Sequence, residues 1–155
     1  MHTDRKKTVR IRKIGAKDRD QWRVLWAGYQ AFYGHSDRPQ DFYDRAFGRL
    51  ISGDAGEFCG LVAERDGRLI GLVHYVFHPH LWRAEGVCYL QDLFTDPAAR
   101  GTGVGRALIE AVCEQATAAG AGAVYWLTAE DNYSGRMLYD RVASRTPFIK
   151  YQRDL

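Results

Sequence analysis

The chain has 155 residues, of which 46% are hydrophobic and 26% charged, proportions that are ordinary for a soluble globular protein. This length predicts one domain, residues 1–155, with a core of its own. The formal net charge of +3 is too small to indicate nucleic-acid binding. No apolar run approaches the ~18 residues of a membrane span, and the first residues lack the apolar segment of a signal peptide.

The cysteines argue against a disulfide framework and against a metal site. Cys59, Cys88 and Cys113 are odd in number, widely spaced and contain no C-x-x-C pair. All three lie in apolar stretches, where cysteine usually serves as a small core residue. We therefore expect a reducing, cytoplasmic location and no bound metal.

The first part of the chain predicts one strand and two helices. Apolar and charged residues alternate over residues 8–14, as in a half-buried strand. Asp18 or Asp20 can cap a helix that ends at Gly34. Pro39 suits the first turn of a second helix, which ends at Gly53. Both helices are rich in aromatic residues, most of which we expect in the core.

The remainder predicts strands that alternate with two more helices. An Asp66-Gly67 hairpin joins strands over residues 58–64 and 69–77, and residues 78–86 read as a loop. The later elements are a strand over 87–95, a helix after the glycines that ends at Ala119-Gly120, a short buried strand over 123–128, a helix over 133–142 and a final strand over 148–153 that closes the sheet.

The segment between the strand at 87–95 and the helix after it is rich in glycine. Gly101, Gly103 and Gly105 alternate there, and Arg100 and Arg106 flank them. Glycines let the backbone come close to a ligand, and the start of the helix adds unpaired N–H groups and a positive dipole end. The segment therefore predicts a phosphate site made of Arg100, Gly101, Thr102, Gly103, Val104, Gly105 and Arg106.

The pattern of this loop separates several phosphate-binding classes. A dinucleotide fingerprint would need glycine at Arg106, and no Gly-Lys pair exists for a P-loop. A plain connecting turn is the simplest alternative, although the strand before the loop and the long helix after it favour a site. The pattern that is present, [Q/R]-x-x-G-x-[G/A], is filled by Arg100, Gly103 and Gly105. It resembles the acyl-CoA loop of the GNAT superfamily of N-acetyltransferases.

A second motif and the order of the elements support this resemblance over nearly the whole chain. Residues 132–139, from Asn132 to Tyr139, look like the family's N-x-x-A-x-x-[LF]-Y, with Gly135 in place of alanine. The Gly-Phe that often follows is Ala143-Ser144 here. The resemblance implies an α/β (α+β) fold of the GNAT type, with a mixed central sheet and helices on both faces. The last strands are similar to the yeast histone and D-amino-acid acetyltransferase branch. Residues 89–94 look like diamine acetyltransferases, although Gln91 stands where those carry glutamate.

The resemblance also assigns roles to particular residues. Acetyl-CoA would be the co-substrate, with its pyrophosphate on the glycine loop. Its pantetheine would pair with Leu93, Phe94 and Thr95, with the Leu93 N–H aimed at the developing oxyanion. Asn132 would bind the pantetheine side, and Tyr139 would protonate the departing thiolate.

The reaction also needs a base, because an alkyl ammonium must lose a proton before it can attack. Asp92 is the first candidate, since it precedes the thioester track on the central strand. Glu64, Glu85 and Glu130 are the other candidates. A strand carboxylate that is simply bonded to a neighbouring backbone is an equally good interpretation of Asp92.

The acceptor is expected to be a primary amine, either a small amine or amino acid or a lysine side chain. Tyr29, Tyr33 and Asp37 would form its pocket, because aromatic faces and carboxylates hold cations. The sequence does not identify the amine. The main alternative is a non-catalytic module that binds or senses acyl-CoA. The family also suggests a possible homodimer, with no nucleic-acid or membrane partner.

Overall fold

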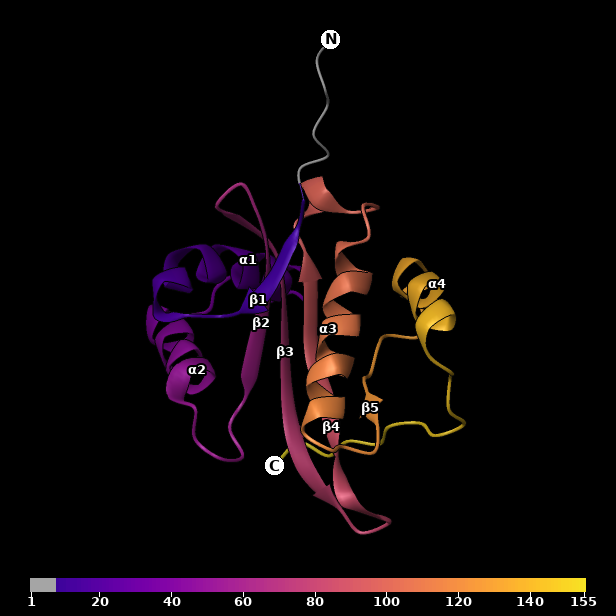
Figure 1. The fold of residues 1–155 in the computed structure, drawn as a ribbon. Helices are drawn as coiled ribbons and strands as arrows, with labels where there is room; N and C mark the ends of the chain where they lie inside the picture. The colour runs from indigo at the N-terminus through magenta and orange to yellow at the C-terminus, as the bar shows by residue number, and fades with distance from the viewer. Residues whose placement is uncertain (1–7) are drawn as a thin grey trace.

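The computed structural model describes residues 8–155, which contain one five-stranded mixed sheet in the order β1-β2-β3-β4-β5. Every neighbouring pair is antiparallel except β4 and β5, which are parallel. Figure 1 shows the long β3 and β4 at the centre of the fold. The strands are β1 Arg10–Lys13, β2 Cys59–Arg65, β3 Arg68–His80, β4 Arg83–Thr95 and β5 Val124–Tyr125.

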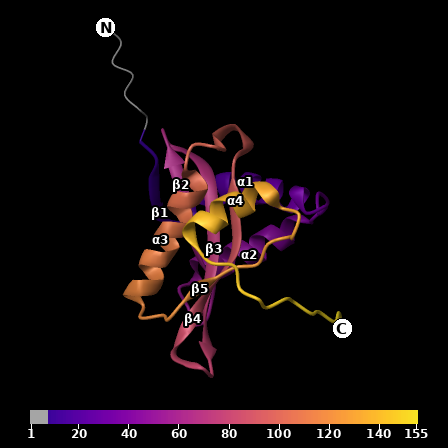
Figure 2. The same ribbon diagram turned by 90° about the vertical axis from the view of Figure 1, so that its right-hand side faces the viewer.

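Helices cover both faces of this sheet, as Figures 1 and 2 show from two directions. The elements α1 Arg19–Phe32 and α2 Gln40–Ser52 pack on one face, and α3 Val104–Ala118 packs on the other. The helix α4 Tyr133–Val142 lies beside α3, and two short 3-10 turns, η1 Ala16–Asp18 and η2 Pro97–Ala99, precede α1 and α3. This confirms the expected mixed sheet with helices on both faces. None of the described helices is long and apolar enough to cross a membrane.

Local sequence signals set most of the element boundaries. Pro39 occupies the cap position before α2, and Gly53 ends that helix in the left-handed conformation with φ +71°. The Asp66-Gly67 turn between β2 and β3 has positive φ at both residues, +54° and +75°, as a two-residue hairpin requires.

The sheet is buried on both faces by two apolar clusters. On one side, Leu108, Ile109 and Val112 of α3 are fully or almost fully buried against the strands. On the other, Trp22 of α1 is 0% exposed and stacks on Trp26. Cys88 is a buried core residue, and Cys59 and Cys113 are partly buried against the α3 side, as their apolar surroundings predicted.

The loop predicted over residues 78–86 is wrong, because the two strands continue through most of it. β3 runs to His80 and β4 begins at Arg83, with His78 opposite Val87 and His80 opposite Arg83. The ladder is irregular between His78 and His80, where Pro79 cannot donate a hydrogen bond. The proline is thus accommodated at an irregularity and does not end the strand.

The final strand predicted over residues 148–153 is also wrong, since these residues form no ladder in the structure. Phe148 and Ile149 are 77% and 76% exposed. The expected neighbour, β5, has only two residues, Val124–Tyr125, in place of the six predicted over 123–128. A six-residue strand needs a neighbouring strand of similar length to pair with. Because β5 is only two residues long, the alternating residues at 148–153 have no such neighbour.

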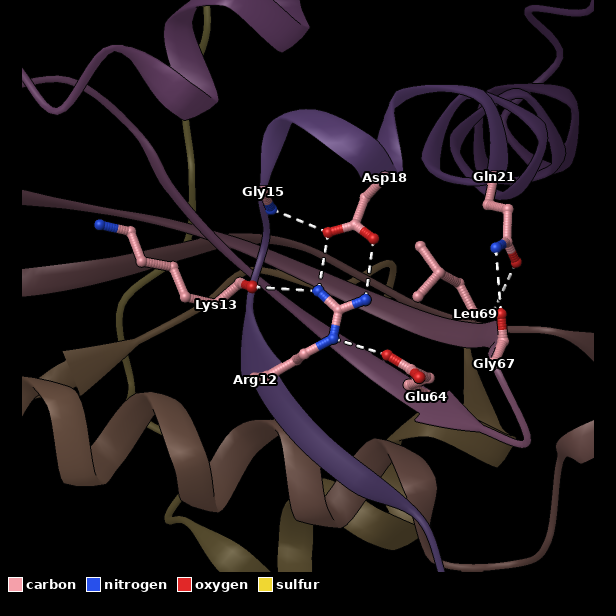
Figure 3. A network of polar contacts seen from close by, with 8 residues as sticks. All are labelled: Arg12, Lys13, Gly15, Asp18, Gln21, Glu64, Gly67 and Leu69. Carbon is pink, nitrogen blue, oxygen red and sulfur yellow. Dashed lines mark hydrogen bonds and ion pairs between the residues drawn. The ribbon is translucent and has the colours of Figure 1, made fainter.

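Arg12 of β1 ties the first strand to the start of α1 and to β2. Its guanidinium contacts both carboxylate oxygens of Asp18 at 2.7 and 2.8 Å, and its Nε donates to Glu64 at 2.6 Å (Figure 3). The Gly15 N–H also donates to Asp18 at 2.8 Å. The bond from Arg12 holds the pKa of Asp18 below its ordinary value, despite the burial of the carboxylate.

We predict that Arg12→Leu lowers the free energy of unfolding by about 3 kcal/mol, because it leaves Asp18 buried without its cation. Urea unfolding at pH 7 measures this difference. The difference should shrink as the pH falls below the ordinary Asp18 pKa of 3.8, because the pair stabilises the fold only while the carboxylate is ionised. Arg19→Leu breaks an exposed pair with Asp44 and should change stability little. Equal losses in the two variants would contradict the assignment.

Candidate active site

A β-bulge at Gln91 interrupts the central strand β4. Side chains that would share one face of the strand therefore point to opposite faces before and after the bulge. His74 pairs with Asp92 and Tyr75 with Leu90, so Gln91 is the extra residue. Leu90 belongs to the cluster under α3, whereas Phe94 belongs to the cluster under α1 and α2. Without the bulge, the alternation of a strand would place both on one face.

After the bulge, β4 no longer pairs with β5. β5 pairs with β4 only at Cys88↔Val124 and Tyr89↔Tyr125, and no later residue of β4 pairs there in the described chain. A small cavity of about 30 Å³ lies between β4 and the segment that follows β5. We name this space the thioester cavity. The residues that line it are Tyr29, Tyr33, Leu90, Gln91, Leu93, Ile109, Trp126, Leu127, Thr128 and Tyr139.

Tyr139 projects from α4 into the thioester cavity. Its ring meets Trp126 edge-on, with centroids 5.5 Å apart. Burial, with a smaller contribution from Tyr33, raises the pKa of the Tyr139 phenol above its ordinary value of 10.0. The phenol therefore keeps its proton at neutral pH and can donate it to a group in the cavity.

The glycine loop forms the expected turn into α3. Gly101 and Gly103 have φ of +74° and +86°, and Gly103 occupies the cap position of the helix. The Ala107 N–H donates to the Gly103 carbonyl, so the N–H groups of the first turn, residues 104–106, point out of the helix start. Arg100 steadies the loop by donating from Nε to the Thr95 carbonyl at 3.2 Å. The geometry suits a pyrophosphate.

Asn132 holds the start of α4 beside the thioester cavity. Its side-chain oxygen accepts from the Gly135 N–H at 3.2 Å, and its Nδ2 donates to the hydroxyl of Thr128 at 3.0 Å. Thr128 lines the cavity, although Asn132 does not. Contact between Asn132 and pantetheine stays a prediction.

Asp92 is buried and paired with a side chain, not with the neighbouring backbone. It is 6% exposed, and its Oδ2 lies 2.8 Å from His74 Nδ1. The other ring nitrogen of His74 lies 2.9 Å from Trp22 Nε1. The sequence did not predict a role in the site for His74 or Trp22. The available signal was a histidine in the middle of an otherwise apolar strand, residues 69–77.

A second cavity, of about 100 Å³, lies on the α1 and α2 face of β4. Three of its lining residues are tryptophan or phenylalanine, Asp92 and His74 also line it, and Gln91 lines both cavities. The residues that line this aromatic cavity are Trp22, Trp26, Ala46, Arg49, Leu50, Phe58, His74, Gln91 and Asp92.

Tyr29 interacts with Asp92, which lines the aromatic cavity. Tyr29 itself lines the thioester cavity, and burial together with the charge and hydrogen bonding of Asp92 raises the pKa of its phenol. Tyr33 lies beside it, with ring centroids 4.9 Å apart. Asp37, the third residue predicted for the acceptor pocket, lies in the exposed turn between α1 and α2 and lines neither cavity.

The structure separates Asp92 from the other candidate bases. Glu64 is engaged with Arg12, and Glu85 lies on the β3–β4 hairpin against Gly122. Glu130 is exposed in the turn before α4. None of the three lines the thioester cavity or the aromatic cavity, so Asp92 is the carboxylate beside the predicted thioester track.

Comparison with known proteins identifies the class that this fold and site define. The model of the acetyltransferase (GNAT) family matches residues 20–143. The D-amino-acid N-acetyltransferase HPA3 of Saccharomyces cerevisiae is 35% identical over 145 residues, which cover 93% of this chain and 89% of the yeast protein. The chain therefore belongs to the GNAT acetyltransferase family, and its resemblance to the yeast D-amino-acid branch is confirmed.

Solved structures agree on the fold. The aminoglycoside N-acetyltransferase AAC(6')-Iy in complex with CoA has a TM-score of 0.84 at 21% identity, with 97% of each chain covered. The ribosomal-protein-alanine N-acetyltransferase of Brucella melitensis biovar Abortus 2308 has a TM-score of 0.76 at 24% identity, covering 96% of this chain and 100% of that chain. At these identities the likeness concerns the fold alone.

We predict that Gly103→Asp abolishes acetyl-CoA binding in titration calorimetry. The change places a side chain at φ +86° and a negative charge at the helix start where phosphate is expected. Gly53→Asp is the matched control, since it makes the same change at φ +71° at the distant end of α2 and should leave binding intact. A folded Gly103→Asp protein with full affinity would refute the phosphate site.

Proposed function

We propose that this GNAT protein transfers the acetyl group of acetyl-CoA to the nitrogen of a small primary amine by direct attack in a ternary complex. One observation carries the proposal: Leu93, Tyr29 and Tyr139, from three separate elements, line a single cavity between β4 and the chain after β5. Asp92 precedes Leu93 on β4 and lines the aromatic cavity. This arrangement supplies a thioester track and an acid in one cavity, with a candidate base on the adjacent residue of β4.

The glycine loop and β4 would hold the co-substrate. The backbone N–H groups of residues 101–106 cradle the pyrophosphate. Leu93, Phe94 and Thr95 lie where β4 lacks a strand neighbour, so that edge offers backbone groups to pantetheine. The Leu93 N–H stabilises the oxyanion that forms when the amine attacks the thioester carbon. The Thr95 carbonyl is already bonded to Arg100, which leaves the earlier residues as the main track.

Asp92 would prepare the nucleophile. An alkyl ammonium has a pKa near 10.4, so only about one molecule in a thousand is neutral at pH 7.4. Asp92, directly or through water and Tyr29, takes one proton from the ammonium. The neutral amine then attacks, and the C–S bond of the tetrahedral intermediate breaks.

Tyr139 would complete the proton balance. It donates its proton to the departing thiolate, and the second proton that leaves the nitrogen restores the phenol. The products are the acetylated amine, CoA with its free thiol, and one proton released to solvent from Asp92. The raised pKa of Tyr139 suits it for this role, because the phenol stays protonated until above its ordinary value of 10.0.

The acceptor would be a small amine, with free amino acids as the first candidates. Tyr29 and Tyr33 form a wall of the thioester cavity, and aromatic faces hold cationic amines. The yeast relative is named for D-amino acids, which makes these the first compounds to assay. Two points about the acceptor stay predictions: that it can be a lysine side chain, and that Asp37 contacts it. A homodimer and a cytoplasmic location also stay predictions.

The non-catalytic alternative, a module that senses acyl-CoA, needs no acid in the cavity. Thiol release from acetyl-CoA in the presence of D- and L-amino acids, small amines and basic peptides separates the two functions. A catalyst releases thiol in proportion to the amine, whereas a sensor binds acetyl-CoA without turnover.

We predict that Tyr139→Phe reduces kcat by about 100-fold or more, because the ring remains but the proton is lost. The KM for acetyl-CoA should change little. Tyr133→Phe, on the same helix but 73% exposed, is the control and should behave as the unmodified protein. If kcat of Tyr139→Phe were unchanged from pH 6 to 9, the phenol would be structural and the acid would have to be sought elsewhere.

A further inference from the structure

Three buried side chains form a continuous polar chain through the apolar layer between α1 and the sheet. Trp22 of α1, His74 of β3 and Asp92 of β4 are 0%, 4% and 6% exposed. Trp22 Nε1 lies 2.9 Å from His74 Nε2, and His74 Nδ1 lies 2.8 Å from Asp92 Oδ2. A polar chain at this depth is costly to build unless each member is satisfied, which here it is.

The chemistry of Trp22 determines which nitrogen of His74 carries the proton. An indole N–H can only donate, so His74 Nε2 must present a lone pair to it. The proton of the neutral imidazole is then on Nδ1, and it points at the Asp92 carboxylate. Protonation of Nε2 would set two N–H groups against each other and break the bond to Trp22.

His74 is therefore a neutral donor to Asp92, and this suits a base better than an ion pair would. A buried carboxylate that lacks donors tends to take up a proton and is then no longer a base. A cation at the same place would hold it ionised but make it a weaker proton acceptor. A neutral N–H stabilises the carboxylate without adding a positive charge.

We propose that Trp22 and His74 are positioning residues, which keep Asp92 ionised and oriented toward the acceptor amine by locking His74 in the neutral Nδ1–H form. The inference rests on the proposed acetyl transfer, in which Asp92 is the base. The charged or titratable groups around His74 are Asp92 itself, Tyr29 of α1, which interacts with Asp92, and Arg49 of α2, which lines the same aromatic cavity. Neither His74 nor Trp22 contacts the reacting atoms in this scheme.

The chain offers a closely matched pair of variants on α1. Trp22 and Trp26 are one helical turn apart, stack on each other at 5.1 Å and belong to the same cluster. Trp26 Nε1 is also buried but has no hydrogen-bond partner among the described residues. Trp22→Phe and Trp26→Phe thus remove similar amounts of buried indole, but only the first releases His74 Nε2.

Nitrogen-15 NMR of the histidine rings tests the lock without any assay of activity. In the unmodified protein and in Trp26→Phe, His74 should show a protonated Nδ1 and an unprotonated Nε2 from pH 6 to 9. In Trp22→Phe, Nε2 has lost its indole donor, so a signal from a protonated Nε2 should appear. A His74 ring that carries its proton on Nε2 in the unmodified protein, or that gives the same Nε2 signal in the two variants, would overturn the inference even if acetyl transfer is confirmed.

The pH dependence of kcat/KM for the amine tests the consequence. In Trp22→Phe, His74 could accept a proton on Nε2 and weaken Asp92 as a base, so kcat/KM should fall more steeply toward acidic pH than in the unmodified protein. Trp26→Phe should keep the original profile. Identical pH profiles in the two variants would show that Trp22 acts only through packing.

A second pair of substitutions serves if Trp22→Phe does not fold. His74→Gln keeps an N–H donor for Asp92, whereas His74→Leu does not. We expect kcat to fall at least about tenfold more in His74→Leu than in His74→Gln, with acetyl-CoA affinity retained in both. Equal kcat values would contradict the role of the donor. A protein with the locked tautomer but no turnover of any amine would instead refute the proposed function.

Discussion

The site depends on two features of the central strand β4: a bulge, and the loss of pairing with β5 in its later part. The extra residue at Gln91 moves Leu90 and Asp92 to opposite faces, and the two-residue β5 leaves the later part of β4 without a neighbour. Backbone groups that a longer β5 would have bonded are thus available beside the thioester cavity. The same bulge directs Asp92 into the layer of α1, where a carboxylate would otherwise be unfavourable. The short β5 therefore produces the track, and the bulge produces the environment of the base.

Residues of helix α1 contribute both to the core and to the site. Trp22 and Trp26 fill the layer above the sheet, and Tyr29 and Tyr33, one to two turns later, line the thioester cavity. Gly28 lets the helix approach the ring of Phe94, since a Cβ there would lie 3.2 Å from it. Because the helix is held by buried aromatics, its two tyrosines and its contact with His74 are placed by packing. Rigid placement of this kind is what a proton-transfer site needs.

Most of the fold was predictable from the sequence because its signals are local. Pro39, Gly53 and the Asp66-Gly67 turn act within a few residues of themselves, and the glycine loop with Tyr139 carries recognisable motifs. The errors concern pairing between distant segments: Pro79 sits inside an irregular ladder, and residues 148–153 have no long edge to join. The bond of His74 to Trp22 joins residues 52 positions apart on a strand and a helix, so no spacing rule could have predicted it.

The central claim is that Asp92 deprotonates an amine that attacks acetyl-CoA. The most direct test is the pH–rate profile of thiol release with a reactive amino acid, measured for the unmodified protein and for Asp92→Asn. Near pH 7 the variant should lose about 100-fold or more in kcat/KM with unchanged acetyl-CoA affinity, and the loss should shrink as the pH approaches the pKa of the amine. A loss that stays constant across this range, or no loss at all, would contradict the assignment of Asp92 as the base.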